Sequence, residues 1–319
     1  MKPLLALVVF CLAALSTPAR DFPETWAYLM KGEERYFPAV SPITDVGCFS
    51  AAVDGDGRLS GGHLKPPALS GAGADTRYHL VITIPWSTTL AHIYLNPELP
   101  FRQRIIDGIV ARCGPFDGVQ IDIESVSSKD KAAFLKFLVA VKKALPDDKI
   151  FSVAVMARWA AHKQKNPSDA FDYAFIGKVA DRVIIMAYDE HYRGGAAGPI
   201  ASLPWCRSIF DHALQTIPAE KIVMGVPLYG RAWQKEAIAK SFRNPEVWTD
   251  LRINRAELAS TPEEGGSYSY STNVTINVHF ESMPSLNAKL DLYATQPVAG
   301  VAFWRISQEP RGFWEQLAD

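Results

Sequence analysis

The chain alternates between short apolar segments rich in β-branched residues and longer segments with an amphipathic pattern. Eight of the apolar segments have the length and composition of buried β-strands: residues 25–30, 44–51, 78–84, 116–124, 149–156, 182–188, 221–229 and 298–304. Stripes of helical period lie between most of them, over residues 100–112, 129–145, 170–180, 203–217 and 285–294. Strand followed by helix, repeated, predicts a parallel sheet with the helices outside.

Eight such strands predict a closed (β/α)8 barrel, the TIM barrel, in which functional side chains lie at the carboxyl ends of the strands. Residues 54–74, after the second strand, are rich in Gly, Pro and Ser and predict a turn and a loop. Residues 234–281, between strands 7 and 8, are too long for a simple connection. Alternation over residues 267–280 predicts a small inserted β-hairpin there. We expect one domain over residues 20–319, without a large second subdomain and with a shallow, open groove.

The beginning of the chain has the pattern of a secretory signal peptide. One lysine precedes an apolar run from Leu4 to Leu15, and small residues follow at Ser16 and Ala19. The run is about a dozen residues long, too short to cross a hydrocarbon core of roughly 30 Å as a helix. We therefore expect residues 1–19 to direct secretion or export to the periplasm, and we expect no stable membrane anchor.

Charge and cysteine content narrow the possible partners. The 33 basic and 34 acidic residues give a formal net charge of −1, which offers no electrostatic basis for binding nucleic acid. Cys48, Cys113 and Cys206 follow the signal segment, and an odd number without a CxxC spacing predicts buried thiols rather than a disulfide framework or a zinc site. We expect a monomer that needs neither a metal nor a cofactor.

The most informative segment is Phe116-Asp-Gly-Val-Gln-Ile-Asp-Ile-Glu124. Side chains alternate along a strand, so Gln120, Asp122 and Glu124 share one face, and the valine and isoleucines between them share the other. Carboxylates two residues apart have Cα atoms roughly 7 Å apart. Repulsion and desolvation raise the pKa of one of them, as a general acid near neutral pH requires. The same pattern is compatible with a hydrogen-bonded polar layer inside the barrel.

This segment resembles the DGxDxDxE signature of glycoside hydrolase family 18, the chitinases and their relatives. Three further segments resemble motifs of the family and occur in the same order: Met186-Ala-Tyr-Asp189, Gly225-Val-Pro-Leu-Tyr-Gly-Arg231 and Gly300-Val-Ala-Phe-Trp304. The resemblance covers nearly all of the chain after the signal segment, and is greatest to the spore-wall, peptidoglycan and chitobiase-like branch. It implies a glycosidase for β-linked N-acetylglucosaminides, with chitin oligosaccharides, peptidoglycan or chitobiose-type glycans as substrates.

The resemblance also implies a retaining mechanism without an enzyme nucleophile, in which the 2-acetamido oxygen of the substrate attacks the anomeric carbon. Glu124 is then the proton donor and later the base for water. Asp122 holds the acetamido N–H and stabilises the developing positive charge, while Tyr188 bonds the acetamido carbonyl. Asp189 and Met186 belong to the same motif as Tyr188 and are expected to contact the sugar.

Aromatic residues at the predicted strand ends bear on substrate binding. Trp304 is expected to be the floor beneath the scissile sugar, because aromatic rings pack well on the apolar faces of sugars. Tyr28 and Tyr229 are expected to line a groove, although either is equally compatible with packing at the barrel rim. The same two interpretations apply to Trp86, Trp159, Tyr192 and Trp233. Arg231 either clamps the substrate or pairs with an acidic neighbour.

One position departs from the family signature: Gln120 stands where many members have Asp, although some bacterial and lysosomal-type relatives carry Asn. An amide can still donate a hydrogen bond to Asp122 but cannot hold a shared proton, so we expect activity with a displaced pH profile. The alternative hypothesis is a lectin-like protein that binds chitin or GlcNAc on the same barrel without cleaving it. The presence of Glu124, Asp122 and Tyr188 favours the enzyme.

Overall fold

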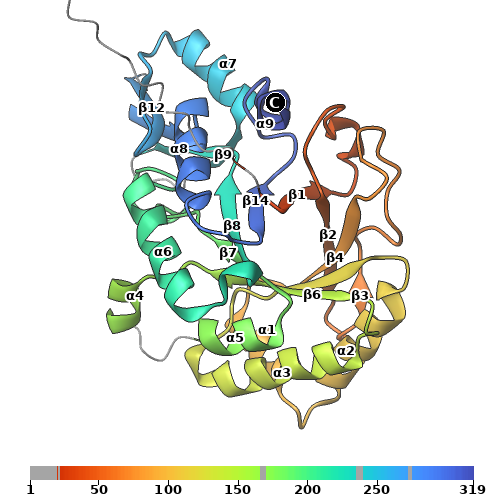
Figure 1. The fold of residues 1–319 in the computed structure, drawn as a ribbon. Helices are drawn as coiled ribbons and strands as arrows, with labels where there is room; N and C mark the ends of the chain where they lie inside the picture. The colour runs from red at the N-terminus through yellow and green to blue at the C-terminus, as the bar shows by residue number, and fades with distance from the viewer. Residues whose placement is uncertain (1–19, 21, 166–169, 235–239, 272–274) are drawn as a thin grey trace, which may run out of the picture.

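The computed structural model describes residues 20, 22–165, 170–234, 240–271 and 275–319, so the expected signal peptide, residues 1–19, lies outside the described residues. Within them, parallel strands close into a barrel (Figure 1). The barrel strands in chain order are β1 (Glu24–Met30), β2 (Asp45–Val53), β4 (Arg77–Thr83), β5 (Gly118–Asp122), β6 (Ile150–Met156), β7 (Arg182–Met186), β8 (Ile222–Pro227) and β14 (Gly300–Trp304). Strand β1 pairs with both β14 and β2, which closes the sheet and confirms the predicted (β/α)8 fold.

Helices cover the outside of the barrel (Figure 1). Five of them match predicted segments: α2 (Pro100–Cys113), α3 (Lys131–Ala144), α5 (Tyr173–Val179), α6 (Leu203–Thr216) and α8 (Met283–Tyr293). Four were not predicted: α1 (Thr88–Leu95), α4 (Ala160–Lys165), α7 (Asn244–Asn254) and α9 (Phe313–Ala318). No helix in the described ranges has both the length and the apolar character needed to cross a membrane.

The loop predicted after the second strand is confirmed. Residues 54–74, all of them described, form turns and the short strand β3 (Leu59–Ser60), which pairs antiparallel with β2. A 3-10 turn, η1 (Glu34–Tyr36), lies in the preceding connection, between β1 and β2. The connections from β1 to β2 and from β2 to β4 are therefore irregular and contain no α-helix before β4.

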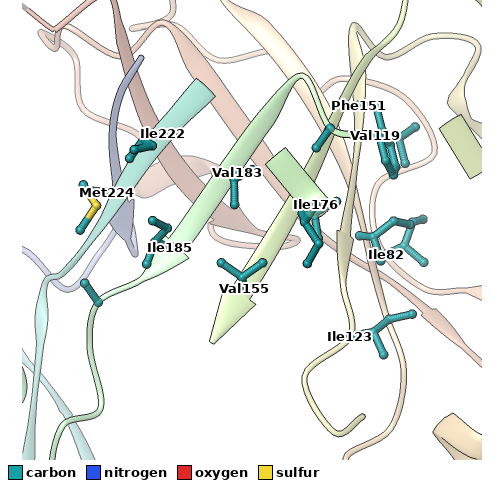
Figure 2. Close-up of a cluster of buried hydrophobic side chains, with 14 of the residues drawn as sticks. Ile82, Val119, Ile123, Phe151, Val155, Ile176, Val183, Ile185, Ile222 and Met224 are labelled. Carbon is teal, nitrogen blue, oxygen red and sulfur yellow. The ribbon is translucent and has the colours of Figure 1, made fainter. Parts of the chain in front are cut away.

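The main hydrophobic core lies between the outer face of the barrel and the helices. Figure 2 shows part of it, with strand residues such as Ile82, Val119 and Val155 and with Ile176 of α5, which belong to one cluster of buried side chains. Val119, Ile121 and Ile123 all belong to this core, whereas Gln120 lies inside the barrel, where it bonds Tyr28 and Ser152. The alternation predicted for this segment is thereby confirmed, and it aims the polar face of β5 into the barrel.

Charged residues close the amino-terminal end of the barrel. Asp45, the first residue of β2, is fully buried and accepts hydrogen bonds from Arg77 Nε (2.8 Å) and Nη2 (2.7 Å). His79 Nε2 lies 2.7 Å from the same carboxylate. Arg77 and Arg182 both donate to Glu24, at 2.9 and 2.7 Å. This network ties four strands together at the end of the barrel opposite the mouth, where charged residues serve stability.

The connection between β8 and β14 is larger than predicted. The hairpin is present, but it belongs to a five-stranded antiparallel sheet with helix α7 beside it. In sheet order the strands are β10 (Lys240–Arg243), β9 (Tyr229–Gln234), β13 (Thr275–Phe280), β12 (Gly265–Ser271) and β11 (Ala259–Thr261). The sequence thus predicted the hairpin, β12 and β13, but not the three further strands or helix α7. The barrel strand ends at Pro227, and β9 starts at Tyr229 and leads the chain directly into the inserted sheet.

A buried ion pair anchors the inserted sheet to the barrel. Lys289 of α8 is 0% exposed, and its Nζ lies 2.8 Å from Glu281 Oε2, just after β13. Ser285 Oγ donates to the same oxygen at 2.7 Å. Because both charges are removed from water, each depends on the other for its stabilisation.

The three cysteines predicted to be buried thiols are free and buried, which confirms the prediction. Burial raises the pKa of Cys206 to about 11. Burial, together with the nearby charge of Glu34, raises the pKa of Cys48 to about 12. Burial also raises the pKa of Cys113. Since the thiolate is the reactive form, these residues act as packing groups in the folded protein.

Candidate active site

The carboxyl end of β5 places the two predicted catalytic carboxylates at the mouth of the barrel. Asp122 is the last residue of the strand, and Glu124 follows two residues later. Both border a pocket with a volume of about 170 Å³. The pocket is lined by Tyr28, Asp122, Glu124, Ala154, Met186, Tyr188, Asp189, Tyr229, Arg231, Ser241, Trp304 and Gln308.

Nine of the ten predicted site residues border this pocket, although they are spread over the whole chain. Tyr28 comes from β1, Met186 is the last residue of β7, and Trp304 is the last residue of β14. They converge because the carboxyl ends of parallel barrel strands meet at one rim.

Gln120 is the exception, because it lies beneath the pocket. Its side chain is fully buried; Oε1 accepts a hydrogen bond from the Tyr28 hydroxyl at 2.8 Å, and Nε2 donates to Ser152 Oγ at 3.4 Å. The predicted bond to Asp122 is replaced by these two contacts. The prediction that Gln120 binds the substrate directly is therefore corrected. Gln120 comes two residues before Asp122, so it lies too deep in the barrel to border the pocket, and it positions Tyr28 instead.

The electrostatics of the site favour a retained proton. Burial and the negative charge of Asp189 raise the pKa of Glu124 to about 7. Burial and Glu124 raise the pKa of Asp122 well above its ordinary value. Within the described part of the chain, the buried Oδ1 of Asp122 has no hydrogen-bond partner. Burial and nearby negative charge thus make both carboxyls resist ionisation, next to an unpaired polar oxygen.

One wall of the pocket is a charged cluster. Arg231 Nη2 lies 2.7 Å from each carboxylate oxygen of Asp189, and Nη1 donates to Ser241 Oγ at 3.1 Å. The Tyr229 hydroxyl also donates to Asp189. Of the two roles considered for Arg231, pairing with an acidic neighbour is thus the one seen here. The cluster holds Asp189 in a left-handed backbone conformation, φ 61°, that is uncommon for residues other than glycine.

Trp304 forms the aromatic side of the pocket. Its ring lies 5.2 Å from that of Tyr28 and 4.7 Å from that of Phe49, measured between centroids. These neighbours fix the indole at the end of β14, where one of its surfaces borders the pocket.

The other aromatic residues considered for the groove do not border the pocket. Trp86 and Tyr192 are 74% and 61% exposed, Trp159 packs against Trp205, and Trp233 is buried in a cluster with Tyr229. For Trp159 and Trp233 the structure supports packing at the rim, whereas for the exposed Trp86 and Tyr192 the sugar-binding interpretation stays a prediction. Position at a strand end alone does not distinguish the two cases.

The sequence did not predict Ala154, Ser241 or Gln308 as pocket residues. Gln308 is 7% exposed, and its Oε1 has no hydrogen-bond partner among the residues described. The sequence feature that could have identified Gln308 is its position four residues after Trp304, in the segment that follows the last barrel strand.

Both the motifs and the geometry agree with a known family. The sequence profile of glycosyl hydrolases family 18 matches residues 99–309, which is more than half of the 319 residues. The chain belongs to glycosyl hydrolases family 18. The resemblance deduced from the four sequence motifs is thereby confirmed.

Relatives of this family 18 chain include two proteins of Bacillus subtilis (strain 168). The uncharacterized glycosylase YvbX of Bacillus subtilis (strain 168) is 31% identical over 227 residues, which is 68% of this chain and 65% of the relative. The cortical fragment-lytic enzyme of the same organism is 26% identical over 292 residues, 87% of this chain and 68% of that protein. The chain thus spans less than two thirds of the length of the first of these relatives.

Solved structures share the family 18 barrel. The spore cortex-lytic enzyme SleL of Bacillus cereus superposes with a TM-score of 0.77 at 24% identity, over 92% of this chain and 73% of that one. A chitinase of Chromobacterium violaceum ATCC 12472 superposes with a TM-score of 0.79 at 20% identity, over 92% and 97%. At these identities the likeness establishes the fold.

Proposed function

We propose that this protein hydrolyses β-linked N-acetylglucosaminides with retention of configuration, assisted by the 2-acetamido group of the substrate. The observation that supports this most strongly is the pair formed by Asp122 and Glu124 in a pocket bordered by Trp304. One carboxyl has a pKa near 7, as an acid that works at neutral pH requires, and the other keeps a buried oxygen free of protein partners. The names of relatives, cortical fragment-lytic enzymes and chitinases, agree with it.

In the first step Glu124 donates its proton to the glycosidic oxygen as the bond from that oxygen to the anomeric carbon breaks. The carbonyl oxygen of the acetamido group attacks the same carbon from the opposite face. The leaving group departs as an alcohol, and the sugar becomes a cyclic oxazolinium cation. Glu124 is left as a carboxylate.

In the second step the Glu124 carboxylate takes a proton from water, and the water oxygen attacks the anomeric carbon. The bond to the acetamido oxygen breaks, and the acetamido group is restored. Two inversions at one carbon give net retention, and Glu124 regains its proton, so the cycle is complete.

Three further residues orient the acetamido group and the ring. The free oxygen of Asp122 is placed to accept the acetamido N–H, and its charge stabilises the cation. The Tyr188 hydroxyl donates to the acetamido carbonyl, while Trp304 packs against the apolar face of the sugar. Because the proposed chemistry needs a 2-acetamido group, we propose chitin oligosaccharides, peptidoglycan or chitobiose-type glycans as substrates.

The test compares the wild type with Glu124→Gln on chitin oligosaccharides, peptidoglycan and a chitobiose-linked glycopeptide. We expect the wild type to cleave at least one of them with the β-anomer appearing first by NMR, and the variant to lose activity by about 10²–10⁴-fold. Glu220→Gln is the matched control, since Glu220 is exposed and lies in the turn before β8. Binding without cleavage by the wild type would instead support the lectin-like alternative.

A further inference from the structure

The segment after β14 is held against the end of β1 at one side of the pocket. The Arg305 guanidinium forms an ion pair with Glu33, and the two side chains are 17% and 24% exposed. The backbone N–H of Ile306 donates to the carbonyl of Tyr28 at 3.1 Å. Two chain segments 272 residues apart in sequence are thereby fixed together at the barrel mouth.

The same segment is also joined to the inserted sheet. The backbone N–H of Asn244, which begins α7, donates to the carbonyl of Gln308 at 3.1 Å. Next to it, Arg243 lies close to Tyr36 of η1. Arg35, which donates to the Tyr36 hydroxyl at 2.8 Å, lowers the pKa of that hydroxyl, and Arg243 lowers it further. The segments after β1 and β14 and the start of α7 thus meet.

We name this set of contacts the β1–β14 wall; it comprises Glu33, Tyr36, Arg243, Asn244, Arg305 and Gln308. The active-site pocket reaches Ser241 and Gln308 on one side of it. A second hollow, of about 400 Å³, is bordered by Asn244 and Glu309. The hydrogen bond from Asn244 to Gln308 links a residue that borders the second hollow to a residue that borders the active-site pocket.

The position of Glu124 fixes the direction of the substrate relative to the wall. In the closed barrel β5 lies opposite β14, with three strands between them on either side. The acid must reach the oxygen that joins the scissile sugar to the leaving group, so the leaving group lies on the Glu124 side. The non-reducing end of the scissile sugar then points towards the β1–β14 wall.

We propose that the β1–β14 wall makes this protein an exo-acting glycosidase, which releases single N-acetylglucosamine residues from the non-reducing end of a glycan. This rests on the function proposed above and specifies which bond is cut. A pocket of about 170 Å³ is small beside the roughly 300–1,000 Å³ of ordinary ligand pockets, and it suits one sugar ring. In this proposal the wall closes one end of the groove that the sequence predicts to be open.

Gln308 gives the wall a specific role in recognition. Its side-chain oxygen is buried at the pocket and has no partner in the described residues, a state that costs free energy until a donor arrives. A sugar at the chain terminus offers a free hydroxyl where an internal sugar carries a glycosidic bond. The unpaired oxygen of Gln308 therefore accepts a hydrogen bond from a hydroxyl of the terminal sugar.

The test follows the first products from a chitin pentasaccharide whose reducing end has been reduced to the alditol. We expect free N-acetylglucosamine and the tetrasaccharide alditol to appear first by mass spectrometry. Early release of a disaccharide or a trisaccharide, or of the terminal alditol itself, would overturn exo action but leave the proposed hydrolysis intact. No cleavage of any glycan by the folded wild type would overturn both.

Opening the wall is expected to change the product pattern. In Glu33→Ala/Arg305→Ala the ion pair is lost, and we expect the initial ratio of disaccharide to monosaccharide to rise at least fivefold. Lys142→Ala, which removes an ion pair with Asp181 at the other end of the barrel, is the control and should leave the ratio unchanged. An unchanged ratio in a folded double variant would contradict the role of the wall.

A second variant tests Gln308 independently of the wall. We expect Gln308→Leu to raise KM for p-nitrophenyl N-acetylglucosaminide about tenfold with a smaller effect on kcat, because one hydrogen bond to the terminal sugar is lost. An unchanged KM would contradict recognition of the terminal hydroxyl by Gln308.

Discussion

At the scale of single residues, Glu124 determines the pH range of the proposed reaction. It must carry a proton to donate one, and its pKa is about 7 in the folded protein. We therefore expect kcat/KM to fall roughly tenfold per pH unit above that value. Initial rates on a chitin trisaccharide between pH 5 and 9 measure this, and a rate that stays constant up to pH 9 would contradict the assignment of Glu124.

The same carboxyl links pH to stability. Folding raises the pKa of Glu124 from 4.5 to about 7, so its contribution is fully present below pH 4.5 and is lost as pH rises through 7. We expect Glu124→Gln to have a higher Tm than the wild type at pH 8, where the wild type buries a charge, and a similar Tm at pH 4.5. Scanning calorimetry at both pH values measures the difference. Equal Tm values at pH 8 would show that the folded protein does not resist ionisation of Glu124.

Gln120 shows which features of a site residue the sequence predicts and which it does not. The alternation along the strand correctly assigned Gln120 and Asp122 to the interior of the barrel. The alternation did not predict how far each side chain lies below the mouth of the barrel, because the periodicity of a strand is the same at the rim and in the core. The hydrogen bond to Tyr28 comes from a residue 92 positions away, so only the folded chain reveals it.

At the scale of elements, the ion pair between Glu281 and Lys289 is expected to hold the inserted sheet on α8. Glu281→Ala leaves the Lys289 charge buried without its partner, which should lower the free energy of unfolding by about 3–5 kcal/mol. Removing both charges, in Glu281→Gln/Lys289→Met, should recover most of the loss. Urea unfolding measures both variants, and equal destabilisation of the single and double variants would contradict the pairing argument.

The barrel elements were predictable because each repeats a strong local pattern, an apolar run for a strand and a stripe for a helix. The missed helices lack that pattern. Helix α7 buries only Asn244 and Val247, and α1 is a short helix of eight residues that buries only Ala91, Tyr94 and Leu95. The β1–β14 wall was not predictable for a different reason: its contacts join distant parts of the chain and follow no local period.

At the scale of the whole molecule, the charges at the base of the barrel link its closure to pH. Burial acts to raise the pKa of Asp45, but hydrogen bonds from His79 and Arg77 outweigh it, and the net pKa is lowered. A lowered pKa gives stability that is present above the ordinary value of 3.8 and is lost as pH falls through the folded pKa. We expect Asp45→Asn to lower the free energy of unfolding at pH 7 by about 3–5 kcal/mol. Denaturant unfolding measures the loss, and a variant as stable as the wild type would contradict it.

We propose that residues 1–19 are removed on export and that the mature protein begins at residue 20. The apolar run in this segment is the basis for the proposal. Expression of the full sequence in a bacterial host should yield an exported protein whose intact mass, measured by mass spectrometry, matches a chain that starts at Arg20. Retention of the complete chain in the cytoplasm would contradict it.

The three enclosed thiols have a practical consequence. Cys48, Cys113 and Cys206 lie in different parts of the core that surrounds the barrel, and each is at most 1% exposed. An alkylating reagent in solution reaches these thiols only when the side chains packed around them move apart in a local opening of the fold. The rate at which each thiol is alkylated in native buffer therefore measures how often the part of the core around that cysteine opens, and no cysteine has to be introduced for the measurement.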